Sequence, residues 1–311
     1  MPGSTAARVL VVLTAGVAIA SCDIAGSSQG ITTTSAATTT STLSSPTSEA
    51  RAQHPSATTS EPDSSHALLV VGDWGAGTRT QREVASAMAR LAAVTNVEAI
   101  VTTGDNFYID DLDAMVEPFA WAIEDLQIPF WIAWGNHDVE SPAREQVVNE
   151  VFGDTPRWTV RQWGALDLVF LDSNQVTSLP QAAFFLDAMR SSSRPTVVVL
   201  HHPPFSCTHR EATTDVVEQW VAILDQDVFL VLAGHDHSYQ RFEHNGVQYV
   251  VTGGGGAALQ PLQECSPDHP ERLAASESHH FLVLTQSEGV LNLRALDVDG
   301  RQIDSISIDL P

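Results

Sequence analysis

The sequence predicts an α/β protein, in which β-strands alternate with helices and the helices lie outside the sheet. Two observations predict this class. Short apolar runs alternate with helical patterns from residue 67 onward, and special polar residues recur where the apolar runs end. A third observation sets the boundary of the fold, because no such alternation is found in residues 23–65.

The first 22 residues resemble an export signal. Arg8 precedes an apolar run over residues 9–20, which is too short to span a bilayer comfortably. The run ends in Ile19-Ala20-Ser21-Cys22, which resembles the lipobox of bacterial lipoproteins. That resemblance implies cleavage before Cys22 and a lipid anchor on it. An ordinary secretory signal with an incidental cysteine is the alternative, and either signal predicts an extracytoplasmic protein.

Residues 23–65 are rich in Ser, Thr, Ala and Pro and contain no periodic apolar pattern. Such a segment cannot offset the entropy of ordering by burying apolar surface. We therefore predict a disordered linker over 23–65 and a single catalytic domain over 66–311.

The elements of that domain follow from apolar runs and their ends. The run from Leu68 to Val71 predicts a buried strand that stops at Gly72. Residues 80–94 place Val84 and Met88 on one helical face. The same reasoning predicts strands over 99–102, 129–134, 166–171, 196–200 and 228–232, and helices over 114–126 and 180–191.

After Tyr239 the pattern becomes that of strands alone. These strands are predicted over 247–252, 279–286, 289–297 and 301–309, with Asp299-Gly300 as the turn of the last hairpin.

The charge of the chain limits its partners. There are 15 basic residues, all of them Arg, and 38 acidic residues, which gives a formal net charge of −23. Such a surface repels nucleic acid and anionic lipid, so a phosphorylated partner needs a local positive site. We expect no nucleic-acid partner and no membrane contact besides the lipid anchor.

Cys207 and Cys265 are the two cysteines outside the signal region. In an oxidising compartment two such cysteines are able to pair, but spacing alone does not place them within disulfide distance. The sequence leaves the pairing open.

Five short blocks of polar residues stand at five predicted strand ends. A glycine at a strand end allows a tight turn that directs the next side chain into the cleft, and carboxyl ends of strands meet at one edge. Asp, Asn, Tyr and His together suit iron, zinc or manganese rather than calcium. The blocks are Gly72-Asp73-Trp74-Gly75, Gly104-Asp105-Asn106-Phe107-Tyr108, Gly135-Asn136-His137-Asp138, Val198-Val199-Leu200-His201-His202 and Gly234-His235-Asp236-His237.

Together these blocks resemble the calcineurin-like metallophosphoesterases. Tyr108, three residues after Asp105, makes them similar to the small, tartrate-resistant type of purple acid phosphatase. The resemblance covers roughly residues 66–311. It implies a four-layer α/β/β/α sandwich with two mixed β-sheets flanked by helices.

The resemblance also implies roles for individual residues. One metal takes Asp73, Tyr108 and His237, with Asp105 bridging to a second metal. That second metal takes Asn136, His201 and His235, where His201 rather than His202 matches the family position. The resemblance implies catalytic, substrate-facing roles for His137 and His209.

A pair of cations bound in this way binds phosphate oxygens and acidifies a water to hydroxide for in-line attack. His137 is the expected general acid for the leaving group, and His209 assists it. A tyrosine phenolate favours a hard trivalent ion, so we expect Fe(III) beside a divalent Fe, Zn or Mn ion.

The sequence thus predicts an exported acid phosphatase-like enzyme that acts on small phosphomonoesters. A phosphodiesterase of the same superfamily is the first alternative. A catalytically inert surface lipoprotein on the same scaffold is the second.

Overall fold

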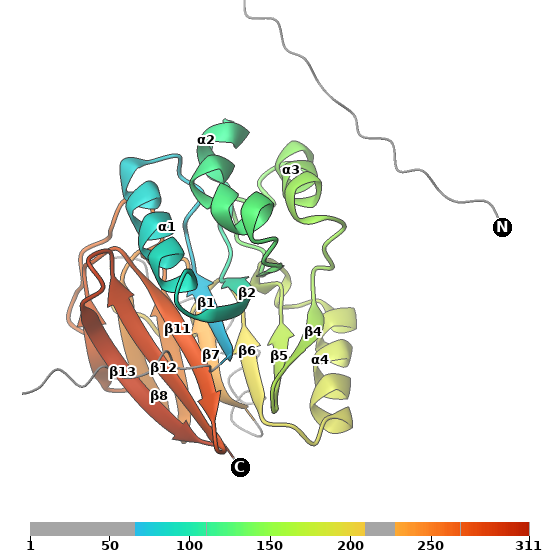
Figure 1. Cartoon of the computed structure of the whole chain (residues 1–311). Coiled ribbons are helices and arrows are strands. Elements are labelled where there is room, and N and C mark those ends of the chain that lie inside the picture. Colours follow the sequence, from blue (N-terminus) through green and yellow to red (C-terminus); the bar gives the residue numbers. More distant parts are fainter. Residues whose placement is uncertain (1–65, 110, 209–227, 268, 311) are drawn as a thin grey trace, which may run out of the picture. The chain divides into compact units, whose positions relative to one another are not determined.

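The computed structural model describes residues 66–109, 111–208, 228–267 and 269–310. These residues form two mixed β-sheets (Figure 1). Among the described residues, the first sheet has six strands, in the order β13 (Gln302–Asp309), β12 (Val290–Asp297), β11 (His280–Ser287), β1 (His66–Val71), β2 (Asn96–Thr102) and β3 (Phe130–Ile132).

The second sheet has seven strands within the described ranges. Their order is β10 (Arg272–Ser276), β8 (Tyr239–His244), β9 (Val247–Thr252), β7 (Val228–Ala233), β6 (Thr196–Val199), β5 (Leu166–Phe170) and β4 (Thr159–Trp163).

The two faces of strand β1 pack against different layers. Leu68 and Val70 belong to the core between the two sheets, together with Phe170 and Val199 of the second sheet. The intervening residues of β1, such as Leu69, pack on the other face of the first sheet. Because side chains alternate between the faces of a strand, a strand covered on both sides is apolar throughout.

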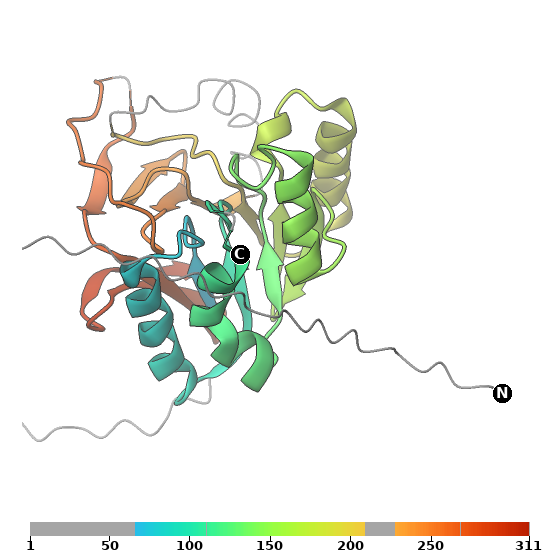
Figure 2. The same ribbon diagram turned by 90° about the horizontal axis from the view of Figure 1, so that it is seen from above.

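Helices cover the outer face of each sheet. Helix α1 (Arg79–Ala92) packs Val84 and Met88 against the first sheet. Helix α4 (Leu179–Ser191) packs Phe185 against the second. In Figure 2 these helices, teal and yellow-green, lie on opposite sides of the strands. The four-layer fold implied by the resemblance is therefore confirmed.

Parallel strands form one half of the first sheet and the middle of the second. In the first sheet β1, β2 and β3 are mutually parallel. In the second, β6 pairs in parallel with β5 and with β7. The loops that follow these strands consequently lie at the carboxyl edges of the sheets, where α/β proteins place their sites.

Two predicted elements need correction. The helix predicted over 114–126 is a short helix α2 (Leu112–Val116), a 3₁₀ turn (Glu117–Phe119) and a π-helical turn (Trp121–Asp125). Pro118 is the second residue of the 3₁₀ turn, and its missing N–H breaks the continuous α-helical hydrogen bonding. The strand predicted over 129–134 is shorter, at Phe130–Ile132.

Several elements had no prediction at all. Helix α3 (Pro142–Phe152) begins after Ser141, whose side chain accepts a hydrogen bond from the backbone of Arg144. It buries fully only Val148, so its apolar periodicity is weak. Strands β4, β8 and β10 carry charged residues and were also missed. Within the described part of the chain, no helix is long and apolar enough to cross a membrane.

Candidate metal centre

Three of the candidate ligands adopt a backbone conformation that is rare for residues with a side chain. Asp73, Asp105 and His235 have φ angles of 56°, 50° and 68°. Each follows a glycine at the end of a parallel strand. Left-handed conformations of this kind cost free energy and persist where the surrounding structure imposes them, as at functional sites.

The loops carrying these residues approach one another closely. A Cβ atom on Gly135 would lie 2.1 Å from both the backbone nitrogen and Oδ1 of Asp105. Only glycine fits at this position, which brings the loop with Asn136 against the loop with Asp105.

The first half of the centre is made by Asp73, Tyr108 and His237. The Tyr108 hydroxyl donates to Asp73 Oδ1 at 2.8 Å. His237 Nε2 lies 3.1 Å from the same hydroxyl and 3.2 Å from Asp73 Oδ1. The three side chains predicted to share one metal thus converge on one point.

The second half is made by Asn136, His201 and His235. Asn136 Oδ1 lies 3.1 Å from His201 Nε2 and 3.1 Å from His235 Nδ1. The two ring nitrogens are 3.2 Å apart. The three side chains predicted to share the second metal also converge.

Asp105 lies between these halves. Its Oδ1 is 3.4 Å from His201 Nε2 and accepts the His137 backbone N–H at 2.9 Å. Ligand atoms of Asp73, Asp105 and His201 all lie within 4.8 Å of one another. This is the position that a bridging carboxylate requires.

Backbone carbonyls orient two of the histidines. His201 Nδ1 lies 2.9 Å from the Thr103 carbonyl, and His237 Nδ1 lies 2.7 Å from the Ala258 carbonyl. A carbonyl oxygen only accepts, so each Nδ1 carries the proton and each Nε2 presents a lone pair to the cluster. Metal-binding histidines are oriented in this way.

The electrostatics of the cluster suit a cation. Burial opposes ionisation of Asp105, but the charge and hydrogen bond of His201 outweigh it and lower the pKa of Asp105. Burial likewise opposes protonation of His201, but Asp105 raises the pKa of His201 to about 9. Without a cation, Asp105 thus favours a proton on His201 Nε2, and a metal ion bound there would take the place of that proton and leave the Nε2 lone pair available.

Burial and the charges of Asp73 and Asp105 raise the pKa of Tyr108 well above 10. A phenolate therefore forms here only beside a strong positive charge. Asp73 and Asp105 are 0% and 1% exposed, and no arginine among the described residues pairs with either. Buried carboxylates need compensating charge, so the donor set fits a pair of metal ions.

Of the two histidines predicted to be catalytic, the structure describes one, His137. The His137 ring lies 4.6 Å from the Tyr108 ring, and its side chain is 35% exposed, so it lies beside the first half of the centre and is reached by solvent. His209 lies outside the described residues. His201 enters the cluster as expected, whereas the neighbouring His202 contacts Ser173 through Nδ1 at 2.8 Å.

Asp138 is a structural residue whose role the sequence left undefined. It is fully buried, and its carboxylate accepts from the Asn106 backbone at 2.8 Å, the Asn106 amide at 2.8 Å, the Phe107 backbone at 3.2 Å and the Gly135 backbone at 2.8 Å. It therefore fastens the loop after β2 to the loop after β3. In the sequence, the signal that could have indicated a role for Asp138 was its position next to His137 in the polar block Gly135-Asn136-His137-Asp138.

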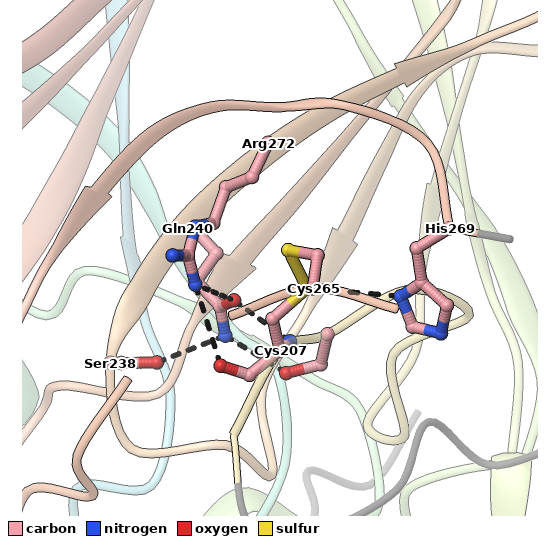
Figure 3. The surroundings of a disulfide bond; sticks show 7 residues. Cys207, Ser238, Gln240, Cys265, His269 and Arg272 are labelled. Carbon is pink, nitrogen blue, oxygen red and sulfur yellow. Dashed lines mark hydrogen bonds between the residues drawn. A yellow bond between two sulfur atoms is a disulfide. The ribbon is translucent and has the colours of Figure 1, made fainter. Parts of the chain in front are cut away.

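A disulfide bond between Cys207 and Cys265 joins the segment after β6 to the loop after β9 (Figure 3). Their Cα atoms are 5.0 Å apart. The Gln263 backbone donates to the Cys207 carbonyl at 2.9 Å, and the Cys207 backbone donates to Gln240 Oε1 at 2.9 Å. The segment that follows His201 is thereby fixed to the loop after β9, which also carries Ala258.

This chain is similar to several known proteins. Residues 66–239 match the profile described as calcineurin-like phosphoesterase. Purple acid phosphatase 3 of Arabidopsis thaliana is 25% identical over 281 residues, which cover 78% of this chain and 77% of that protein.

Two further matches bear on the range of functions. A Rhodococcus erythropolis protein named "Probable cyclic nucleotide phosphodiesterase" is 33% identical over 178 residues, which cover 50% of this chain and 56% of that protein. The solved structure described as "GAP50 the anchor in the inner membrane complex of Plasmodium" has a TM-score of 0.63 at 19% identity and covers 79% of this chain and 89% of its own. At that identity the likeness shows the fold alone.

Proposed function

Because the chain belongs to the calcineurin-like phosphoesterase family, we propose that it is an exported acid phosphatase that hydrolyses phosphomonoesters at a dinuclear Fe(III)–M(II) centre. The observation that carries this proposal is the convergence of Tyr108 with Asp73 and His237 beside the second group of ligands. The match to purple acid phosphatase 3 supports it.

Two cations held by these side chains would bind the phosphoryl oxygens, spread the developing negative charge and activate a water for in-line attack. Asp73, Asp105 and a Tyr108 phenolate contribute three negative charges, so a trivalent and a divalent ion leave a net positive centre. A phosphate dianion is then attracted despite the chain's net charge of −23.

His137 supplies the proton that the leaving alkoxide needs. Its ring lies at the exposed side of the cluster, over Tyr108, and its Nδ1 is 3.5 Å from Glu140 Oε2.

Tyr108 selects the metal because a phenolate is a hard anionic donor that favours Fe(III). Elemental analysis and a visible spectrum of the purified protein test this assignment. We expect iron together with Fe, Zn or Mn, and a charge-transfer band that Tyr108→Phe removes. Tyr249→Phe is the matched control, because Tyr249 lies in the core and is expected to leave the band intact. A colourless wild-type protein without iron contradicts the assignment.

A phosphodiesterase is the second candidate, favoured by the 33% identical relative. Nitrophenyl phosphate and its bis-ester separate the two activities. A monoester dianion carries more charge than a diester monoanion, so the positive centre predicts faster turnover of the monoester. A clear preference for the bis-ester would establish the alternative.

A catalytically inert surface lipoprotein on this scaffold is the third candidate. Purified protein with neither bound transition metal nor phosphoesterase activity would support it.

The place of action is part of the proposal. We expect export by residues 1–22 and a lipid on Cys22, with residues 23–65 as the linker. The Cys207–Cys265 disulfide supports an oxidising compartment. Cys22→Ala is expected to release the protein from membranes, as fractionation measures. An equal membrane-bound fraction of both proteins contradicts the anchor.

A further inference from the structure

His202 lies beside the second half of the centre, although no ligand role is predicted for it. Its ring centroid is 4.9 Å from that of His201 and 4.5 Å from that of His235. One ring nitrogen of each of these three histidines lies within 4.8 Å of the other two. A third imidazole is thus placed at the edge of a pair predicted to bind metal.

Ser173 determines which nitrogen of His202 carries the proton. Ser173 Oγ accepts the His202 backbone N–H at 2.9 Å and lies 2.8 Å from His202 Nδ1. Among the described residues, the Ser173 hydroxyl therefore donates its proton to His202 Nδ1. A neutral imidazole that accepts at Nδ1 carries its proton at Nε2, which makes Nε2 a donor rather than a metal ligand.

The turn that carries Ser173 is fixed to the metal-binding loops. Asp172 Oδ1 accepts the Asn174 backbone N–H at 3.0 Å. The Asn174 amide donates to the carbonyls of Trp134 and Gly135 at 3.2 and 3.3 Å, immediately before Asn136. Ser173 itself is 5% exposed. The position of His202 is therefore fixed relative to the centre.

We propose that His202 is a substrate-binding residue, which donates a hydrogen bond from Nε2 to an oxygen of the phosphate bound at this centre. This inference rests on the proposed function and adds a binding residue to it. The ligand class is a tetrahedral phosphate, either the monoester or the orthophosphate product. Ser173 acts through His202 as a positioning residue.

The test compares His202→Phe and His202→Gln with the wild-type protein. The readouts are the affinity for orthophosphate by calorimetry, its inhibition constant, and metal content. Phe keeps a ring but removes the donor, so we expect phosphate binding about 10-fold weaker or more, with both metals retained. The Gln amide restores an N–H donor and is expected to recover part of the affinity.

Ser173→Ala tests the positioning step. Without the hydroxyl, His202 is no longer held in the Nε2–H form, so phosphate binding weakens although His202 is present. His66→Phe and Ser305→Ala are matched controls at exposed positions and are expected to bind phosphate as the wild type does.

Two results would overturn the role of His202 and leave the proposed function intact. In one, the wild-type protein is metal-loaded and active, and His202→Phe binds orthophosphate with unchanged affinity. In the other, His202→Phe loses a metal ion, which makes His202 a ligand instead of a donor. A wild-type protein with neither metal nor activity overturns the proposed function, and the role of His202 with it.

Discussion

Individual residues at the centre depart from the local rules that govern the rest of the chain. Asp73, Asp105 and His235 are held in left-handed conformations, and two of them are buried carboxylates. Both features oppose folding when considered alone. Bound cations would offset the cost of the buried carboxylates. These residues therefore fit a role in cation binding better than a role in stabilising the fold.

His137 offers a prediction at this scale. His137→Asn is expected to lower kcat about 10²–10⁴-fold for an alkyl phosphate, whose leaving group needs a proton. The loss is expected to be much smaller for nitrophenyl phosphate, because nitrophenolate leaves without protonation. Parallel kinetics on both substrates measure this difference. Equal losses on both, or a loss of metal, would show that His137 is not the general acid.

His280 predicts a dependence of stability on pH. It is fully buried, and Nε2 lies 3.0 Å from Thr252 Oγ1. Burial lowers its pKa from 6.5 to about 4. Below pH 6.5 the His280 side chain is therefore protonated in the unfolded chain, whereas in the folded protein it becomes protonated only near pH 4. The free energy of unfolding falls over this interval, by about 3 kcal/mol from this residue.

Denaturant unfolding between pH 7 and pH 4 measures the effect. His280→Gln is expected to be less stable at neutral pH but to lose less stability on acidification. The exposed His66→Gln variant is the control and should keep the wild-type slope. If His280→Gln has the same slope as the wild type, His280 is not responsible.

At the scale of elements, the centre depends on how the loops are fastened together. Asp138 joins the loops after β2 and β3. Asn174 joins the turn after β5 to the loop after β3. The disulfide joins the segment after β6 to the loop after β9. Ligands from separate loops can keep a fixed geometry because each loop is anchored to a neighbour.

The disulfide provides the prediction for this scale. Replacing both Cys207 and Cys265 by Ser is expected to lower the free energy of unfolding by about 2–5 kcal/mol, since the bond spans 58 residues. Metal retention should also weaken, because Ala258, which orients His237, lies on the same loop. Unfolding in the presence and absence of reductant measures the first effect.

The double variant is the control for reductant. It lacks the disulfide, so reductant should not change the midpoint of its unfolding transition. A wild-type midpoint that is also insensitive to reductant would contradict a stabilising disulfide.

At the scale of the whole fold, both sheets contribute candidate ligands. Asp73, Asp105 and Asn136 follow strands of the first sheet, and His201 and His235 follow strands of the second. The core between the sheets is apolar and extends up to these loops. Metal ions bound there would link the two sheets at their carboxyl edges.

Removal of metal is therefore expected to destabilise the fold as well as abolish activity. A ligand present at 1,000 times its Kd stabilises the folded state by about 4 kcal/mol, and chelation removes that contribution. Thermal unfolding before and after chelation measures the change in Tm. Re-addition of iron and zinc should restore the Tm, whereas calcium should not, because it binds histidine poorly. An unchanged Tm on chelation would contradict a metal link between the sheets.

Much of the centre could be predicted from the sequence because its signals are local. A strand buried on both faces is a continuous apolar run, as at Leu68–Val71, and a glycine marks its end. The side chain after that glycine lies at the carboxyl edge of the sheet. The positions of Asp73, Asp105 and His235 follow from these facts, whichever strands turn out to be neighbours.

Other features depend on pairings between distant segments. The order of strands in two sheets, the bond between Cys207 and Cys265, the clamp at Asp138 and the contact of Ser173 with His202 join residues far apart in the chain. Periodicity records which face of an element is buried but not which element buries it. The sequence by itself therefore determined the class of fold and the chemical types of the candidate ligands. Only the tertiary structure decided which loops meet and which nitrogens of His201, His235 and His237 lie in the cluster, because those depend on contacts formed when the two sheets pack.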